Sequence, residues 1–340
     1  MRSLRFALFG TGFWSRYQLA AWRELQGVEC VALYNRTRSK AQALAAEFGI
    51  NAVYDDAEAL LAREDLDFVD IATSPDLHCR FVLLAAARKL AVVCQKPMAP
   101  SLAECERMVA ACQAEGVPFF IHENWRWQAS IRCLKQVLNE RPIGELVRAR
   151  ISLTTGFDVF ANQPALREMD RFILLDLGSH LLDASRFLFG EPHSLYCRIR
   201  RIRRDIRGED VATAFLEHAC GMSVTCEMSY AGSHVENDSF PETLIFVEGA
   251  KGTIAVTKGF QIRITVNNGT RVISAKPEWY GWADPAYLAV QASIVPCHRN
   301  LLAGLRGCAV PETTGEDNLR TMRLVFAAYG SAENGGLARV

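Results

Sequence analysis

The sequence predicts an α/β domain with a doubly wound parallel sheet, followed by an α+β domain with a mostly antiparallel, open-faced sheet. Residues 1–122 alternate short apolar strands with helical segments of about 10 to 15 residues, as strand–helix–strand units do. A glycine-rich turn joins the first strand to the first helix. Residues 123–340 contain mostly strands separated by glycines and polar turns. We therefore divide the chain into domains of residues 1–122 and 123–340.

The composition is typical of a globular protein large enough for two cores. Of 340 residues, 50% are hydrophobic and 22% are charged. Lys plus Arg and Asp plus Glu number 38 each, which argues against a nucleic-acid binder. No apolar run reaches the ~18 residues of a membrane span. The eleven cysteines form no Cys-x-x-Cys pair and no signal peptide is evident, so we expect a cytoplasmic protein with reduced thiols and no metal site.

The first domain is predicted to alternate strands and helices in strict order. Runs of β-branched and other apolar residues indicate the strands, and amphipathic periodicity indicates the helices. We expect strands at residues 4–9, 30–34, 68–72, 91–94 and 117–121, and helices at residues 17–25, 37–48, 76–88 and 102–115.

The turn after the first strand carries a dinucleotide-binding fingerprint. A first glycine permits the tight turn, a second lets the backbone approach a pyrophosphate, and the following helix offers unpaired N–H groups to it. Ser15 stands where the third glycine of the fingerprint is usual. The predicted phosphate contacts are Gly10, Thr11, Gly12, Phe13 and Trp14.

The end of the second strand bears on the choice of cofactor. Asn35 and Arg36 stand where a ribose-binding carboxylate is usual, and Arg38 and Lys40 follow. These cations would attract a 2′-phosphate, which favours NADP, whereas Asn35 is also able to bond a free 2′-hydroxyl. The alternative is that the cations only solvate a helix N-terminus.

The loop after the strand at residues 68–72 is expected to cover the adenosine or ribose. It contains Thr73, Ser74 and Pro75, and His78 follows in the first helical turn. The histidine either points toward the cofactor or packs against the strand; both interpretations stay open.

A lysine follows the strand at residues 91–94, in the run Gln95-Lys96-Pro97. The carboxyl ends of parallel strands are where such sheets bind ligands, so Lys96 is a candidate for chemistry. We expect a cis bond before Pro97, in a tight turn. The alternative is a solvated lysine at a strand end.

The second domain is predicted to be built on a hairpin-rich sheet. With helices on one face of that sheet, the other face is left for a second subunit, so we expect a homodimer or homotetramer. Strands are expected at residues 146–153, 194–203, 211–217, 222–230, 244–248, 253–257 and 261–266, and helices up to residue 139 and at 172–189, 284–305 and 316–331.

Two segments of this domain carry candidate substrate contacts. Trp125 and Arg126 suit a sugar, since aromatic rings pack on C–H surfaces and guanidinium groups bond hydroxyls; an aromatic wedge is the alternative. Asp176 and His180 are four residues apart on one helical face, with Asp183 next along it. A carboxylate that orients an imidazole makes a general base; the alternative is a surface pair.

The run of six arginines at residues 198–207 is compatible with nucleic-acid binding. However, Ile199 and Ile202 alternate with the cations, and Asp205, Glu209 and Asp210 balance them. We interpret the run as an exposed strand or a subunit interface.

Taken together, three motifs resemble the Gfo/Idh/MocA oxidoreductases, named for glucose–fructose oxidoreductase and inositol dehydrogenase. They are Gly10-x-Gly12, Gln95-Lys96-Pro97 and Asp176-x-x-x-His180, and the resemblance extends to the helix opening at residues 314–319. It implies NAD(P) use, oligomers through the sheet face, a substrate- and ribose-binding role for Lys96, and substrate-binding and acid–base roles for Asp176 and His180. Gln95 departs from the family glutamate, and residues 170–172 depart from its glycine-rich lead-in.

Residues 10–19 and 33–37 look most like the branch of the family that oxidises D-apiose. This implies NAD rather than NADP, and hydride transfer from the anomeric carbon of an aldose to give a lactone. Other activities on the same fold stay open: a polyol or inositol dehydrogenase, an NAD-dependent glycosidase, and a non-catalytic sugar or dinucleotide sensor.

Overall fold

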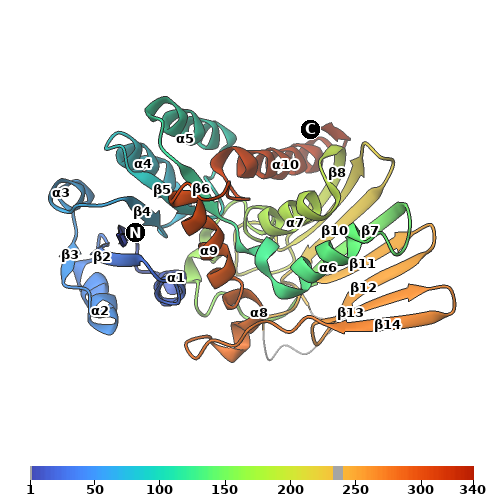
Figure 1. The fold of residues 1–340 in the computed structure, drawn as a ribbon. Coiled ribbons are helices and arrows are strands. Elements are labelled where there is room, and N and C mark those ends of the chain that lie inside the picture. Colours follow the sequence, from blue (N-terminus) through green and yellow to red (C-terminus); the bar gives the residue numbers. More distant parts are fainter. Residues whose placement is uncertain (1, 233–239) are drawn as a thin grey trace. The chain divides into compact units, whose positions relative to one another are not determined.

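The computed structural model describes residues 2–232 and 240–340. The chain forms two compact units, coloured along the sequence in Figure 1. Unit 1 comprises residues 1–123 and 294–322, and unit 2 comprises residues 124–293 and 323–340.

Unit 1 is built on a six-stranded parallel sheet in the order β3-β2-β1-β4-β5-β6. The predicted doubly wound sheet is confirmed, with one short strand, β3, that the sequence did not predict. The strands are β1 (Leu4–Phe9), β2 (Val28–Tyr34), β3 (Ala52–Tyr54), β4 (Phe68–Ile71), β5 (Ala91–Gln95) and β6 (Phe119–His122).

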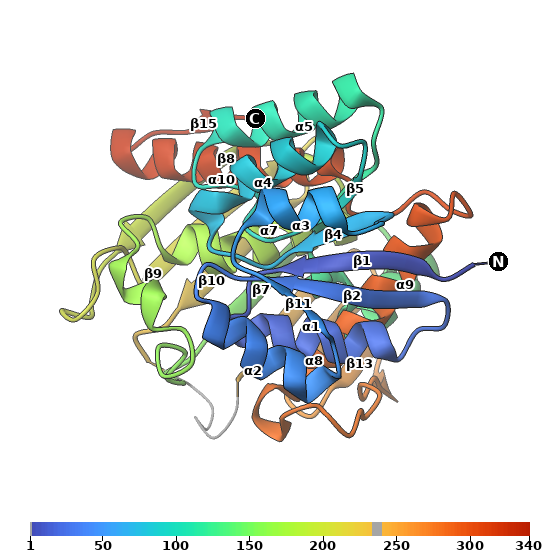
Figure 2. The same ribbon diagram turned by 90° about the vertical axis from the view of Figure 1, so that its left-hand side faces the viewer.

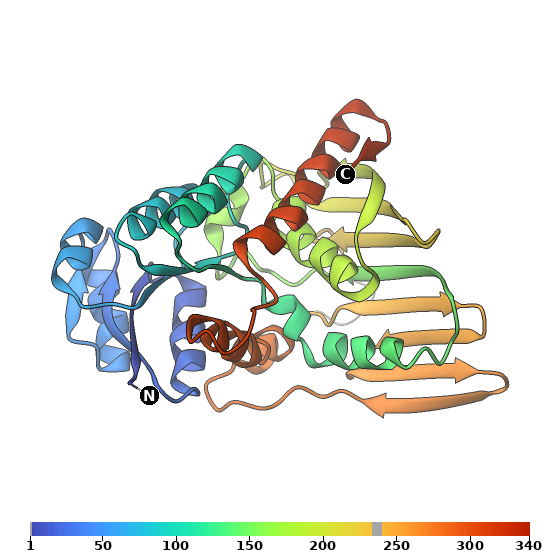
Figure 3. The same cartoon turned by 45° about the horizontal axis from the view of Figure 1, so that its top comes forward.

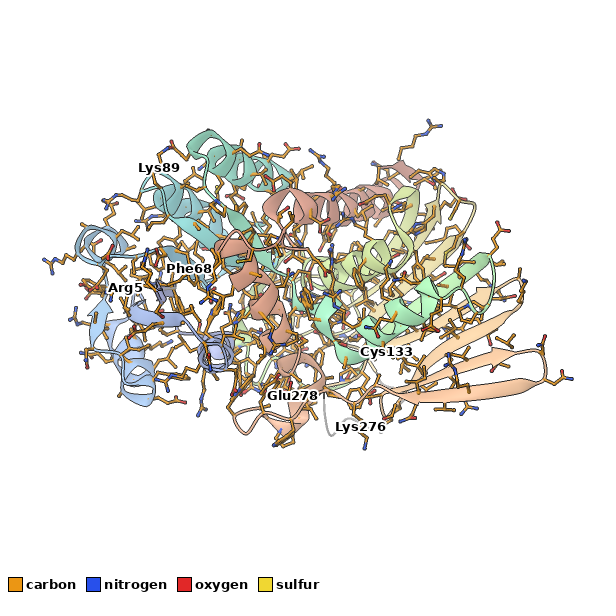
Figure 4. The ribbon with its side chains drawn as sticks, in the orientation of Figure 1. Arg5, Phe68, Lys89, Cys133, Lys276 and Glu278 are labelled. Atoms are coloured by element: carbon orange, nitrogen blue, oxygen red, sulfur yellow. The ribbon has the colours of Figure 1, made fainter. Side chains whose placement is uncertain are left out.

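Helices cover both faces of this sheet, with α1 and α2 on one face and α4 and α5 on the other (Figure 2). Between the layers the core is aromatic: Phe68, labelled in Figure 4, stacks on Phe6 with ring centroids 4.8 Å apart. The helices are α1 (Phe13–Arg23), α2 (Arg38–Phe48), α3 (Ala57–Arg63), α4 (Pro75–Ala86), α5 (Leu102–Glu115) and α9 (Ile294–Leu305).

Residues 294–322 belong to unit 1, whereas the sequence analysis placed all of residues 123–340 in the second domain. Helix α9 packs on α1, where the ring of His298 stacks on Trp22 at 3.8 Å. Beyond the helix, the N–H of Ile121 in β6 donates to the carbonyl of Thr313 at 2.9 Å. These contacts join segments far apart in the sequence, which local patterns do not reveal.

Unit 2 is built on a nine-stranded sheet in the order β14-β13-β12-β11-β7-β10-β9-β8-β15. Neighbouring strands are antiparallel except β10 and β7, so the predicted mostly antiparallel sheet is confirmed. The strands are β7 (Leu146–Thr154), β8 (Pro192–Arg200), β9 (Val211–His218), β10 (Ser223–Ser229), β11 (Leu244–Gly249), β12 (Gly252–Thr257), β13 (Gln261–Val266), β14 (Gly269–Ser274) and β15 (Ala338–Arg339).

Helices α6 and α7 lie along one face of this sheet (Figure 3). Burial alternates along strands such as β9, so the sheet has one buried and one open face. No helix of the described ranges is long and apolar enough to cross a membrane. The helices are η1 (Asn124–Trp127), α6 (Ala129–Asn139), η2 (Pro164–Glu168), η3 (Leu174–Gly178), α7 (Ser179–Phe189), η4 (Pro285–Tyr287), α8 (Leu288–Gln291) and α10 (Gly315–Asn334), the last of which begins in unit 1.

Most predicted elements differ from the structure by a few residues at their ends, and three differ in ways that have a structural cause or change the element's form. The helix expected at 172–189 opens with the π-helical turn η3 before α7 begins. The helix expected at 284–305 is divided into η4, α8 and α9. Strand β8 ends at Arg200 rather than residue 203, because the chain turns there: the carboxylate of Asp210 accepts the N–H groups of Ile202 and Arg203 at 2.7 and 3.0 Å.

Candidate functional site

The turn after β1 is shaped by its first glycine. Gly10 has a φ of +98°, and a Cβ there would lie 2.4 Å from the carbonyl oxygen of Ala72, so a larger residue does not fit. A Cβ added at Gly12 would meet nothing within 4 Å. The hydroxyl of Thr11 is buried and has no hydrogen-bonding partner among the described residues. Open space, an orphaned hydroxyl and the N-terminus of α1 together fit a dinucleotide pyrophosphate.

The residues after this turn are half-exposed aromatics. Phe13 and Trp14 open α1, and their ring centroids lie 5.0 Å apart in an edge-to-face contact. Their place in the first turn of α1 puts them beside the N–H groups that would hold the phosphates.

The loop after β2 carries the side chains that were expected to contact the ribose or a 2′-phosphate. The side-chain amide of Asn35 donates to the carbonyl of Thr37 at 3.0 Å, which holds it across the helix entrance. Arg38 forms an exposed ion pair with the carboxylate of Asp55 at 3.5 Å. Arg36 is exposed.

The loop after β4 lies against the glycine turn. Ser74 is exposed, and Pro75 occupies the first turn of α4. The ring of His78 is fully buried behind the loop, which favours the packing interpretation. Its Nε2 lies 3.2 Å from the carbonyl oxygen of Thr73, and its Nδ1 lies 3.1 Å from that of Pro97.

The loop after β5 presents Lys96. The bond to Pro97 is cis, as predicted. The side-chain oxygen of Gln95 accepts the N–H of Lys96 at 2.9 Å, and its nitrogen lies 3.3 Å from Nδ1 of His122 at the end of β6. The glutamine that departs from the family pattern thus anchors the backbone of the lysine.

A buried carboxylate lies deeper in the same unit. Asp70 in β4 accepts hydrogen bonds from Nε1 of Trp22 at 2.8 Å and from the side chain of Gln18 at 3.2 Å. Burial raises the pKa of Asp70 to about 7, although these donors oppose the shift. The sequence analysis missed this group, because a single Asp inside Phe68–Ile71 does not interrupt the apolar pattern of a buried strand.

In unit 2, Trp125 supports His180. The two rings stack with centroids 3.8 Å apart and an interplanar angle of 17°, and the indole Nε1 donates to Oγ1 of Thr243 at 3.0 Å. The indole is 3% exposed, and one of its faces is covered by the imidazole. This differs from the predicted sugar platform: the ring is positioned to hold the histidine.

Arg126 forms a buried ion pair with α7. Its Nε and Nη2 donate to the two oxygens of Asp183 at 2.5 and 2.7 Å, and both side chains are almost fully buried. Arg186 lies 3.6 Å from the same carboxylate. Asp183 therefore joins η1 to α7, and the contacts of Arg126 favour a structural role over the predicted donation to substrate hydroxyls.

Asp176 lies in the π-helical turn η3, a feature that is frequent at functional sites. Its Oδ2 accepts a hydrogen bond from the hydroxyl of Tyr230 at 3.1 Å. Burial and the neighbouring charge of Asp176 raise the pKa of Tyr230 well above its ordinary value, so the phenol stays a donor. That Asp176 orients His180 stays a prediction.

A buried glutamate secures the start of this segment. The carboxylate of Glu209 accepts the N–H of Phe172 at 3.1 Å, the N–H of Leu174 at 3.2 Å and the hydroxyl of Tyr329 at 2.7 Å. These bonds satisfy N–H groups that precede the first full helical turn. Sequence analysis did not identify Tyr230 and Thr243, and it assigned Glu209 only to the balance of nearby arginines, since each comes from a distant strand or loop and belongs to no motif.

The comparisons with known proteins agree with this arrangement. Residues 4–123 match a model of an oxidoreductase family with an NAD-binding Rossmann fold, and residues 131–255 match the GFO/IDH/MocA C-terminal domain. The chain belongs to the Gfo/Idh/MocA family of oxidoreductases. It is therefore an enzyme whose first unit binds NAD.

Relatives in this family extend over nearly the whole chain. A D-apiose dehydrogenase from Paraburkholderia graminis is 44% identical over 97% of this chain and 88% of its own. A second, from Rhizobium rhizogenes, is 40% identical over 98% and 97%. An oxidoreductase from Agrobacterium radiobacter, solved in complex with NAD+, L-tartaric acid and magnesium, has a TM-score of 0.96 and 39% identity and covers 99% of this chain and 98% of its own. The predicted resemblance is confirmed.

Proposed function

We propose that the protein is an NAD-dependent dehydrogenase that oxidises the anomeric carbinol of an aldose such as D-apiose to a lactone. The observation that carries the proposal is the match to two D-apiose dehydrogenases along nearly the full chain. The lysine turn after β5 and the Asp176–His180 segment carry the motifs that resemble those of the family. We choose NAD over NADP because the first unit matches a family model described as NAD-binding, and the similar oxidoreductase from Agrobacterium radiobacter was solved with NAD+.

We assign the chemistry to three side chains. Bound NAD+ supplies the hydride acceptor. The imidazole of His180, stacked on the indole of Trp125, takes the hydroxyl proton. The ammonium of Lys96 stabilises the negative charge that develops on the substrate oxygen. Asp176, held by the hydroxyl of Tyr230, binds a substrate hydroxyl.

A panel of aldoses and polyols, including D-apiose, tests the proposal. Each sugar is offered with NAD+ and with NADP+, and the absorbance of the reduced nicotinamide is followed. Rapid reduction with D-apiose and NAD+ is expected. Turnover of inositols or other polyols alone would make the protein a polyol dehydrogenase. Release of nitrophenol from a nitrophenyl glycoside without net reduction would identify a glycosidase, and no turnover at all would favour a sensor.

We further infer that a second copy of the chain covers the open face of the sheet in unit 2. Cross-strand register aligns one residue from each of five neighbouring strands, β8, β9, β10, β7 and β11, in a single row. These residues are Tyr196, Phe215, Thr225, Arg150 and Phe246. Phe215 is 39% exposed, which is unusual for a strand phenylalanine. A single species of monomer mass in light scattering would overturn this inference, which leaves open a homodimer or homotetramer.

We also place the protein in the cytoplasm. The eleven cysteines are thiols rather than disulfides in the described structure, as expected for a reducing compartment. Most of them are buried, and burial raises the pKa of several, Cys105 and Cys112 to about 12 among them. Cell fractionation tests the location.

A further inference from the structure

His78 is surrounded by backbone oxygen atoms from two loops. Its Nδ1 lies 3.1 Å from the carbonyl oxygen of Pro97 and 3.2 Å from that of Met98, in the loop after β5. Its Nε2 lies 3.2 Å from the carbonyl oxygen of Thr73, in the loop after β4. Strands β4 and β5 are neighbours in the sheet, so one imidazole spans the gap between adjacent loops at its ligand-binding edge.

Each of these loops belongs to a different part of the proposed site. The backbone before Thr73 is packed against the glycine turn, since a Cβ on Gly10 would lie 2.4 Å from the oxygen of Ala72 and 3.0 Å from the nitrogen of Thr73. Pro97 directly follows Lys96. A displacement of either loop would therefore change the place of the lysine relative to the phosphate-binding turn.

We propose that His78 is a positioning residue that clasps the loop of Thr73 to the loop of Lys96, and so sets the lysine at its working distance from bound NAD. The role of Lys96 in this proposal rests on the proposed function. The clasp, by which we mean the contact of the His78 ring with both loops, does not depend on it. The imidazole touches neither substrate nor cofactor and acts only through the two backbones.

The chemistry of the ring agrees with a clasp. A carbonyl oxygen only accepts hydrogen bonds, so a ring nitrogen must donate to form such a bond. Burial lowers the pKa of His78, while the bonds to Thr73, Met98 and Pro97 act in the opposite direction. The lowered pKa leaves the ring neutral, so one nitrogen donates to a carbonyl of one loop while the other nitrogen lies in contact with the carbonyl of the second loop.

Burial alone does not require such an arrangement, as a second histidine shows. His218 at the end of β9 is also buried, yet neither of its ring nitrogens has a hydrogen-bonding partner among the described residues. It packs edge-on against the ring of Phe189. His218 therefore serves as a matched control: it has similar burial but ties no loops together.

The test compares His78→Leu, His78→Gln and His218→Leu in the full chain. NAD+ affinity is measured by titration calorimetry without sugar, and kcat and KM are measured with the best sugar of the panel. His78→Leu is expected to weaken NAD+ binding and to lower kcat by about 10- to 100-fold, as loss of a supporting contact does. His78→Gln, whose amide offers two N–H donors, is expected to recover most of both losses. His218→Leu is expected to change neither NAD+ affinity nor kcat.

The proposal is overturned if folded His78→Leu binds NAD+ and turns over like the wild type, or if His78→Gln is no better than His78→Leu. Should His78→Leu fail to fold, His78→Asn takes its place, because its shorter side chain reaches only one loop; equal NAD+ affinities in wild type, Gln and Asn variants would then overturn the proposal. If no sugar of the panel is oxidised, the proposed function fails, whereas the calorimetric comparison still decides whether the clasp exists.

Discussion

The indole of Trp125 lies flat on the imidazole of His180, with ring centroids 3.8 Å apart. The contact joins the short turn η1 to the first turn of α7, and the hydrogen bond from the indole to Thr243 fixes the indole in turn. A stacked ring restricts the rotation of the imidazole about its side-chain bonds. The orientation of the proposed base is thus set by a residue that precedes it by more than fifty positions in the sequence.

Replacing this tryptophan should therefore affect turnover. Trp125→Leu removes the stacking surface and should lower kcat by about 10- to 100-fold, because a catalytic group that is loosely held rarely adopts its working geometry. Trp125→Phe keeps an aromatic face, loses only the bond to Thr243, and should retain most activity. Steady-state kinetics with saturating NAD+ checks both. Equal kcat in wild type and Trp125→Leu would remove Trp125 from the positioning of His180.

The lysine after β5 gives the most direct test of the chemistry. Lys96→Met should lower kcat by about 10²- to 10⁴-fold, because the developing negative charge loses its cation. NAD+ affinity, measured by calorimetry, should change little. Lys89→Met is the control, since Lys89 is exposed and pairs with Glu115, and it should behave as wild type. Near-normal turnover of Lys96→Met would contradict the mechanism.

The glutamine before this lysine acts on its backbone. Gln95→Ala removes the acceptor of the Lys96 N–H and should lower kcat by about 10-fold, the usual effect of losing one hydrogen bond. Gln95→Glu keeps an acceptor oxygen in the same place and restores the family residue, so its kcat should stay within about threefold of wild type. Kinetics of the two variants in parallel provides the measurement; a larger loss for Glu than for Ala would contradict the anchoring role.

Local patterns in the sequence were sufficient to predict the parallel sheet, the glycine turn and the placement of Lys96 at a strand end. They were not sufficient for elements with weak patterns. Strand β3 has three residues, and β14 has no buried residue and therefore no apolar alternation. The residues of 294–322 pack on α1 and β6, a contact between distant segments that no local period encodes.

The candidate site was predictable to the same extent. Lys96, Asp176 and His180 belong to motifs, and motifs are local. Their supports are not: Tyr230 reaches Asp176 from 54 positions away, and Thr243 reaches Trp125 from 118. The contacts of Trp125 with His180 and of Arg126 with Asp183 were not predictable either, because composition indicates which side chains suit a sugar but not which other residues they contact.

The buried carboxylate of Asp70 predicts a pH dependence of stability. Its pKa is 3.8 when unperturbed and about 7 in the folded chain, so the folded state binds this proton more tightly. The stabilisation from that proton is fully present below pH 3.8 and is lost as the pH rises to 7, by at most about 4 kcal/mol. The side chain of Asp70→Asn cannot ionise. The melting temperature of the variant minus that of the wild type should therefore increase from pH 5 to pH 8.

A second carboxylate supplies the control for this measurement. The hydrogen bond from Arg203 lowers the pKa of exposed Asp205 to about 2, so its stabilising effect is lost only as the pH falls toward 2. The difference in melting temperature between Asp205→Asn and wild type should therefore be constant from pH 5 to pH 8, since Asp205 is ionised throughout in both the folded and the unfolded chain. A constant difference for Asp70→Asn as well would mean that Asp70 does not titrate in this range, and that its bonds to Trp22 and Gln18 outweigh its burial.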